Sequence, residues 1–183
     1  MAVEITTALK ELTGELNDKS FNASNYLGSI GSEEVVNAMI ALLDDSNPET
    51  RFMAARTLGL VENNSTALAA LFETFKKREN SEILGDLLMS LEGFDVSDNY
   101  VEIFKLYLFG SFKVSRIAED LLDHKEFNIT PRVLKKAQKH WVHYSNNVKQ
   151  DEAFTLQKIE VEERLSDLKG FIESAEGENQ STD

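Results

Sequence analysis

The fold is decided by the stretch Gly31-Ser-Glu-Glu-Val-Val-Asn-Ala-Met-Ile-Ala-Leu-Leu-Asp-Asp-Ser-Asn-Pro-Glu-Thr-Arg-Phe-Met-Ala-Ala-Arg-Thr-Leu-Gly59. Ser32 is placed to cap a first helix, whose apolar residues recur at intervals of three and four. The run 44–47 breaks this pattern, and Pro48 opens a second helix at a position where its missing N–H costs nothing. The stretch therefore predicts two helices joined by a tight turn.

A leucine near the end of the second helix returns along the chain. The four copies, Leu27, Leu58, Leu91 and Leu122, lie 31, 33 and 31 residues apart. Aligned on this leucine, the inward-facing positions are Lys19/Ala23/Leu27, Thr50/Ala54/Leu58, Ile83/Leu87/Leu91 and Val114/Ala118/Leu122. The remaining first helices are expected over Ala2–Asn17, Thr66–Arg78 and Asp98–Phe109. Such a period is typical of stacked helical hairpins.

The segment 45–59 resembles the second helix of a HEAT repeat, particularly the bacterial type also found in phycobilisome-linker lyases. The shared features are its aspartate, Arg51, the paired alanines and the terminal Leu-Gly. The resemblance is good over 31–59 and loose over 1–123, where the arginine position holds Ser20, Leu84 and Ser115 in the other repeats. It implies an α-solenoid and a protein-binding role, but not lyase activity. It also implies that Arg51 bridges to Asp44 or Asp45.

The period is lost after Asp123. Thr130 and Pro131 begin a new helix with an apolar stripe, formed by Leu134, Ala137, Trp141, Tyr144 and Val148. A separate basic stripe consists of Arg132, Lys136, Lys139 and His143. A following acidic helix, roughly 150–174, is expected to dock on this basic helix as a hairpin. Alternatively, the last helix forms a coiled coil that gives a homodimer.

The sequence thus predicts an all-α protein, a short α-solenoid of about four HEAT-like helical hairpins followed by a C-terminal helical hairpin. The predicted domains are a repeat domain over 1–127, an amphipathic hairpin over 128–175 and a disordered acidic tail over 176–183.

Composition excludes several classes of function. The 183 residues carry a formal net charge of −13, which disfavours nucleic acid as the main partner. The absence of cysteine excludes disulfides and thiol catalysis and fits a cytoplasmic protein. No stretch is long and apolar enough for a membrane span. His140 and His143 are too few ligands for a metal site, and no catalytic motif is present. Neither a cofactor nor a metal is expected.

We therefore expect a non-enzymatic protein–protein interaction module, an adaptor or regulator that binds its partner on the inner face formed by the second helices. The residues expected to bind the partner are Phe52, Met53, Arg56, Met89, Arg116 and Asp120. One alternative is a bilin-lyase-like protein that handles a cofactor, with Arg56, Arg116, Asp120 and Tyr26 as candidates. Another is nucleic-acid binding through the basic helix 131–149.

Overall fold

The computed structural model describes residues 2–180, with side chains described for residues 4–175. Every regular element within these bounds is helical, which confirms the predicted all-α class. The α-helices are α1 (Ala2–Leu12), α2 (Asp18–Ile30), α3 (Glu33–Leu42), α4 (Pro48–Leu60), α5 (Leu68–Phe75), α6 (Leu84–Leu88), α7 (Tyr100–Phe109), α8 (Phe112–His124), α9 (Pro131–Asn147) and α10 (Glu152–Gln180). The 3₁₀ helices are η1 (Ser65–Ala67), η2 (Arg78–Asn80) and η3 (Met89–Gly93). Within the described part of the chain, no helix combines the length and apolar character needed to cross a bilayer.

The chain divides into two compact units, Met1–Asp95 and Val96–Asp183. The first unit contains α1–α6 and the second contains α7–α10. The boundary predicted after residue 127 falls inside the second unit, because α9 packs against α7 as well as against α10. Of the predicted tail 176–183, the backbone of 176–180 continues helix α10, and 181–183 lie outside the described residues.

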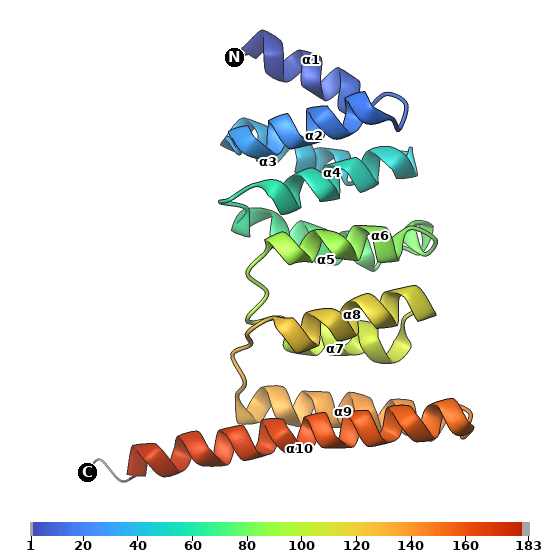
Figure 1. Ribbon diagram of the computed structural model, residues 1–183, viewed down its shortest axis with the longest axis vertical. Helices are drawn as coiled ribbons and strands as arrows, with labels where there is room; N and C mark the ends of the chain where they lie inside the picture. The colour runs from blue at the N-terminus through green and yellow to red at the C-terminus, as the bar shows by residue number, and fades with distance from the viewer. Residues whose placement is uncertain (1, 181–183) are drawn as a thin grey trace. The chain divides into compact units, whose positions relative to one another are not determined.

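The second helices of the first unit are neighbours, as predicted. Helix α1 packs on α2 and α3 packs on α4, while α2 contacts α4, and α4 in turn contacts η3. Figure 1 shows these elements as successive layers of the first unit. Leu27, Leu58 and Leu91 are fully buried between the layers. One inward position was predicted wrongly, since Lys19 is exposed and Ser20 is buried in its place.

Capping residues set the helix ends in the first unit. Ser32 is the N-cap of α3, and its Oγ accepts a hydrogen bond of 3.3 Å from the N–H of Val35. Pro48 is the first residue of α4, as predicted. Helix α1 ends at Leu12 rather than at Asn17, because Asn17 and Ser20 form a capping box that starts α2 at Asp18.

The Leu-Gly pairs near the ends of α2 and α4, Leu27-Gly28 and Leu58-Gly59, are explained by close backbone packing. A Cβ atom on Gly28 would lie 2.6 Å from the Cβ of Leu60, and one on Gly59 would lie 2.7 Å from the carbonyl oxygen of Ser90. Such distances are well below van der Waals contact. The glycines therefore allow α2, α4 and η3 to approach each other closely.

Arg51 is a buried structural residue that reaches Asp45, as the resemblance implied, but it bonds to the backbone carbonyl and forms no ion pair with Asp44 or Asp45. Its side chain is only 4% exposed, and Nη1 donates to the backbone carbonyls of Asp45 at 2.7 Å and Ser46 at 3.1 Å. Its Nε donates to Oδ1 of Asn80 at 2.7 Å. The carboxylate of Asp44 pairs instead with Lys77. Arg51 thus joins the turn before α4 to η2 in the next repeat.

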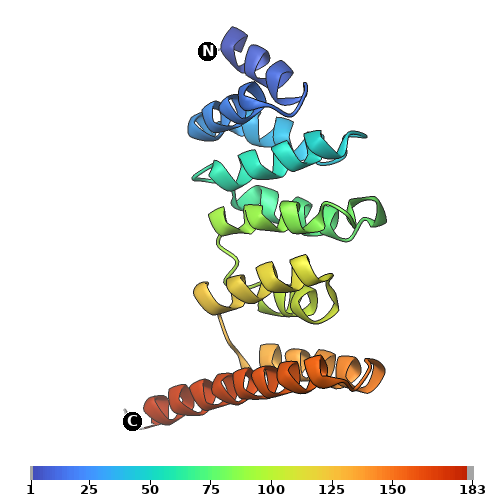
Figure 2. The ribbon, with the colours of Figure 1, turned by 45° about the vertical axis from the view of Figure 1, so that its right-hand side comes forward.

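Aromatic side chains pack between α9 and α10, which form the C-terminal hairpin of the second unit. Helices α9 and α10 lie side by side in Figures 1 and 2, with α10 extending beyond α9. The ring of Trp141 stacks on Phe154 with centroids 5.9 Å apart, and the hydroxyl of Tyr144 donates to Gln157 at 2.8 Å. The predicted hairpin is present, and apolar contacts hold it.

Tyr100 gives a prediction for stability and its pH dependence. Its hydroxyl is buried and has no hydrogen-bond partner within the described part of the chain. We expect Tyr100→Phe to leave the free energy of unfolding unchanged or raise it by about 1 kcal/mol at neutral pH, because an unsatisfied buried group is removed without leaving a cavity. The control Tyr107→Phe should lower it by about 1 kcal/mol, because it removes a bond to Glu160.

Alkaline pH provides a second measurement on the same variant. Burial is the main cause that raises the pKa of Tyr100 from 10.0 to about 12. The unfolded chain therefore loses this proton before the folded chain does, and stability falls as pH rises from 10 to about 12. In denaturant titrations over this range, Tyr100→Phe should lose less stability than the wild type. An equal loss in both proteins would contradict the assignment.

Candidate functional site

The second helices of the first unit present a small aromatic cluster. Phe52 on α4 is half-buried and meets Phe21 on α2 edge-on, with ring centroids 6.3 Å apart. The guanidinium of Arg56 lies 5.2 Å from the centroid of the Phe21 ring. It also donates to Oγ of Ser24 at 2.6 Å and to Oδ1 of Asn25 at 2.8 Å. Arg56 therefore holds α4 against α2.

Two further residues predicted to bind a partner in this unit have opposite environments. Met53 is buried in the core, so the prediction that it contacts a partner beside Phe52 is wrong. The cause is that α4 lies between α2, α3 and η3 and buries most of its circumference. Met89, at the start of η3, is exposed as predicted.

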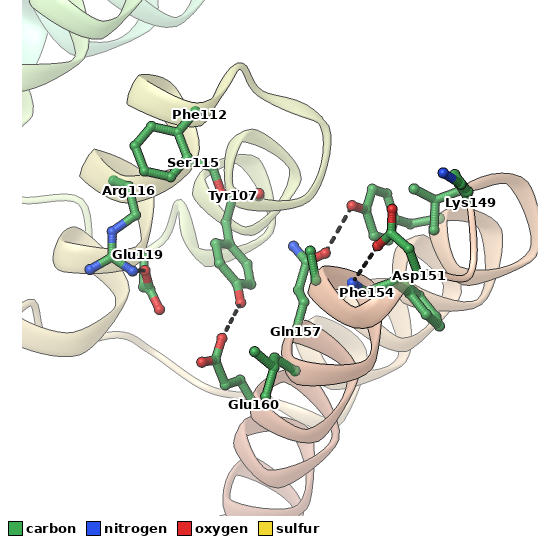
Figure 3. A pocket seen from close by; sticks show the side chains of 14 residues that line it. Tyr107, Phe112, Ser115, Arg116, Glu119, Lys149, Asp151, Phe154, Gln157 and Glu160 are labelled. Carbon is green, nitrogen blue, oxygen red and sulfur yellow. Dashed lines mark hydrogen bonds and ion pairs between the residues drawn. The ribbon is translucent and has the colours of Figure 1, made fainter.

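A groove of about 530 Å³ opens in the second unit among α7, α8, α9 and α10 (Figure 3). Its wall on α8 includes Phe112, Arg116 and Glu119, and its wall on α10 includes Leu156 and Glu160. Among the predicted residues, Arg116 lies in this groove. Asp120 is exposed on the same helix but does not line it.

Polar side chains inside the groove bind each other. The hydroxyl of Tyr107 donates to Glu160 at 3.4 Å, and Arg116 pairs with Glu119 at 2.6 Å. Burial and then the nearby carboxylates of Glu160 and Glu119 raise the pKa of Tyr107 above its usual range. Burial also raises the pKa of Glu119, which Arg116 opposes. Tyr107 thus stays a neutral hydrogen-bond donor at physiological pH.

Two large apolar side chains in the groove remain open to solvent. Phe112 is 84% exposed and Leu156 is 64% exposed. Phe112 was not among the residues predicted to bind a partner. The sequence does indicate that Phe112 is exposed, because it follows the N-cap Ser111 and lies outside the buried stripe of Val114 and Ala118. Leu156 stands off the apolar stripe of α10 in the same way.

The predicted basic patch lies on the exposed side of α9. Arg132, Lys136, Lys139 and His143 are all exposed, as is Lys135 beside them. Within the part of the chain with described side chains, no ion pair joins these residues to acidic groups of α10. Burial, followed by the charges of Lys105, Lys139 and His143, lowers the pKa of the adjacent His140.

Among the described side chains, no three histidine, aspartate or glutamate residues gather closely enough to hold a metal ion. His124 Nδ1 contacts the backbone carbonyl of Asp120 at 2.9 Å, as a helix-end residue.

The family model described as HEAT repeats matches residues 6–92, which span α1 to η3 of the first unit. No curated protein matches the chain. The paired helices, the neighbouring second helices and the family match agree that residues 6–92 form a HEAT-like helical array.

Proposed function

We propose that this chain is a non-enzymatic protein-interaction module, and that the groove between α8 and α10 binds a segment of a partner protein. HEAT repeats generally serve as protein-interaction scaffolds. Two exposed apolar side chains carry the proposal, because Phe112 and Leu156 both line one groove. Exposed apolar groups gathered in a groove with a polar rim are typical of protein-binding sites. A cytoplasmic location stays a prediction from the sequence.

The polar groups of the groove support binding rather than catalysis. Ser115 Oγ donates to the backbone carbonyl of Tyr107 at 2.7 Å, so it is not paired with a base. The hydroxyls of Tyr107 and Tyr144 are held by Glu160 and Gln157. With these groups already paired, the free binding capacity of the groove is mainly apolar.

Arg116 contributes to the rim of the groove. Its side chain is exposed and paired with Glu119 in an i, i+3 arrangement on α8. Only the Arg116 side of this pair is exposed, since the Glu119 side chain is mostly buried. The guanidinium has further N–H donors, so it can bind a partner carboxylate while it stays paired with Glu119. A partner segment with an apolar anchor followed by an acidic side chain would fit this arrangement.

Photocrosslinking tests the proposal on the full-length chain in its native host. A photoreactive amino acid replaces Phe112 in one variant, Leu156 in a second and exposed Ser166 of α10 in a control. We expect one and the same protein to be crosslinked from positions 112 and 156, but not from 166. A crosslink only to a second copy of this chain would instead support the homodimer.

Alanine variants give the quantitative prediction. We expect Phe112→Ala and Leu156→Ala each to weaken binding of the crosslinked partner by about tenfold, because each removes an apolar anchor of about 1.4 kcal/mol. Phe171→Ala is the matched control, since Phe171 is an exposed apolar residue of α10 outside this groove. Equal binding by the wild type and both groove variants, measured by calorimetry, would rule out the groove as the site.

A further inference from the structure

A second surface of the chain carries positive charge on one helix. Its members, here named the basic face, are Arg132, Lys135, Lys136, Lys139 and His143 of α9. All five are exposed, and they lie opposite the buried stripe of Leu134, Ala137 and Trp141. Residues 131–150 contain no acidic side chain, although the whole chain has a net charge of −13. We propose that the basic face binds an acidic amphipathic helix of a partner protein, at a site separate from the proposed groove.

The lysines and the arginine of the basic face form no ion pairs with described side chains, unlike several other basic residues of the chain. Elsewhere, Arg51 bonds to backbone carbonyls and Asn80, Lys77 pairs with Asp44, and Arg164 pairs with Asp123 at 2.7 Å. Among the described side chains, no ion pair involves Arg132, Lys135, Lys136 or Lys139. Lys105 of α7 adds positive charge beside His140, while Glu102 opposes it. The positive charge is therefore available to a partner of opposite sign.

Apolar contacts flank the basic face. Val142 on α9 is 56% exposed, and Phe109 at the end of α7 is 49% exposed. The ring centroid of Phe109 lies 6.0 Å from the ring centroid of His143 and 5.4 Å from that of Tyr144. Two such side chains can receive the apolar residues of an amphipathic helix, and the cations can pair with its acidic residues.

The dimensions of the basic face fit a helix. Arg132 and His143 are separated by three helical turns, which span about 16 Å at 1.5 Å per residue. A partner helix with glutamates at i, i+4, i+7 and i+11 repeats the spacing of Arg132, Lys136, Lys139 and His143. A polyphosphate chain fits less well, because it has no apolar groups to contact exposed Val142 and Phe109.

Fluorescence anisotropy with synthetic probes tests this proposal on the full-length chain. The probes are a helical peptide with glutamates at i, i+4, i+7 and i+11 and leucines on the adjacent face, a scrambled peptide of the same composition, and a short DNA duplex. We expect the amphipathic peptide to bind at least about tenfold more tightly than the scrambled peptide, and its affinity to fall as salt rises.

Two charge variants with equal net charge decide which surface binds. The test variant is R132E/K136E/K139E, and the control is K10E/K19E/R78E, whose side chains are exposed in the first unit. We expect the test variant to lose at least about tenfold in affinity for the amphipathic peptide and the control to stay within about twofold. Val142→Ser, which leaves charge unchanged, should weaken binding by about threefold.

Three results would overturn the proposal. They are equal loss in both charge variants, no preference for the amphipathic over the scrambled peptide, or tighter binding of the DNA duplex than of either peptide. The last result would assign the basic face to nucleic acid. Phe112→Ala leaves the basic face intact and should bind the acidic peptide as the wild type does, so failure here and failure of the proposed groove are separable.

Discussion

Replacing Gly93 with alanine should lower the free energy of unfolding of the first unit by about 3 kcal/mol, at the upper end of the usual cost of overpacking. A Cβ at this position would overlap the carbonyl oxygen of Gly59 and lie 3.0 Å from the Gly59 Cα. Both neighbours are backbone atoms of α4, so no side-chain rotation can relieve the contact. The carbonyl of Gly93 also accepts a hydrogen bond of 2.9 Å from Nδ2 of Asn64, which holds η3 in place.

Denaturant unfolding followed by far-UV circular dichroism measures this effect. Gly59→Ala, which meets the Ser90 carbonyl oxygen, should cost about 2 kcal/mol. Gly170→Ala is the matched control, because a Cβ there has nothing within 4 Å and the position lies inside helix α10. It should stabilise the second unit by about 0.5–1 kcal/mol. If Gly93→Ala and Gly170→Ala shifted the midpoint alike, close backbone approach would not be the role of Gly93.

Local signals predicted much of this fold because they act through neighbouring residues. Ser32 and Pro48 start helices through bonds and dihedrals confined to one turn, and both were placed correctly. The leucine spacing placed Leu27, Leu58 and Leu91 in the core, since each repeat presents the same face to its neighbour.

Contacts between one repeat and the next could not be predicted from the sequence. Asn80 is the buried partner of Arg51, 29 residues away, and nothing in its local sequence marks it as an acceptor. Met53 is buried because α4 is packed on several sides, whereas apolar periodicity in the sequence indicates only one buried stripe per helix. The first helix was extended too far because the capping signal of Asn17 and Ser20 was not used.

Of the two candidate sites, the basic face could be predicted from the sequence and the groove could not. The basic face was predicted because charge on one helix follows from spacing alone, and its residues are exposed on α9. The groove was not predicted, because it is formed by four helices and only Arg116 among its residues had been selected. Its main signal, exposed Phe112, becomes visible only when the buried stripe of α8 is known.

Replacing Arg51 with methionine should lower the free energy of unfolding of the first unit by about 3 kcal/mol. Methionine fills similar space but leaves Oδ1 of Asn80 and the carbonyls of Asp45 and Ser46 without their donor. Hydrogen bonds from charged donors contribute about 1.5–3 kcal/mol, and the buried Oδ1 of Asn80, left unpaired, adds to the loss. Arg78→Ala is the control, because Arg78 is exposed beside Asn80 in η2 and should change stability by less than about 0.5 kcal/mol.

A double-mutant cycle separates the Arg51–Asn80 contact from the loss of either side chain. Asn80→Ala removes the acceptor of Arg51 Nε and also the donor that reaches the Thr74 carbonyl at 2.8 Å, so we expect a loss of about 2 kcal/mol. If the two residues act as one link between α4 and η2, the double variant should lose about 1 kcal/mol less than the sum of the single variants. Strict additivity in chemical denaturation would mean that Arg51 acts through the Asp45 and Ser46 carbonyls alone, and that the inter-repeat bond contributes nothing to stability.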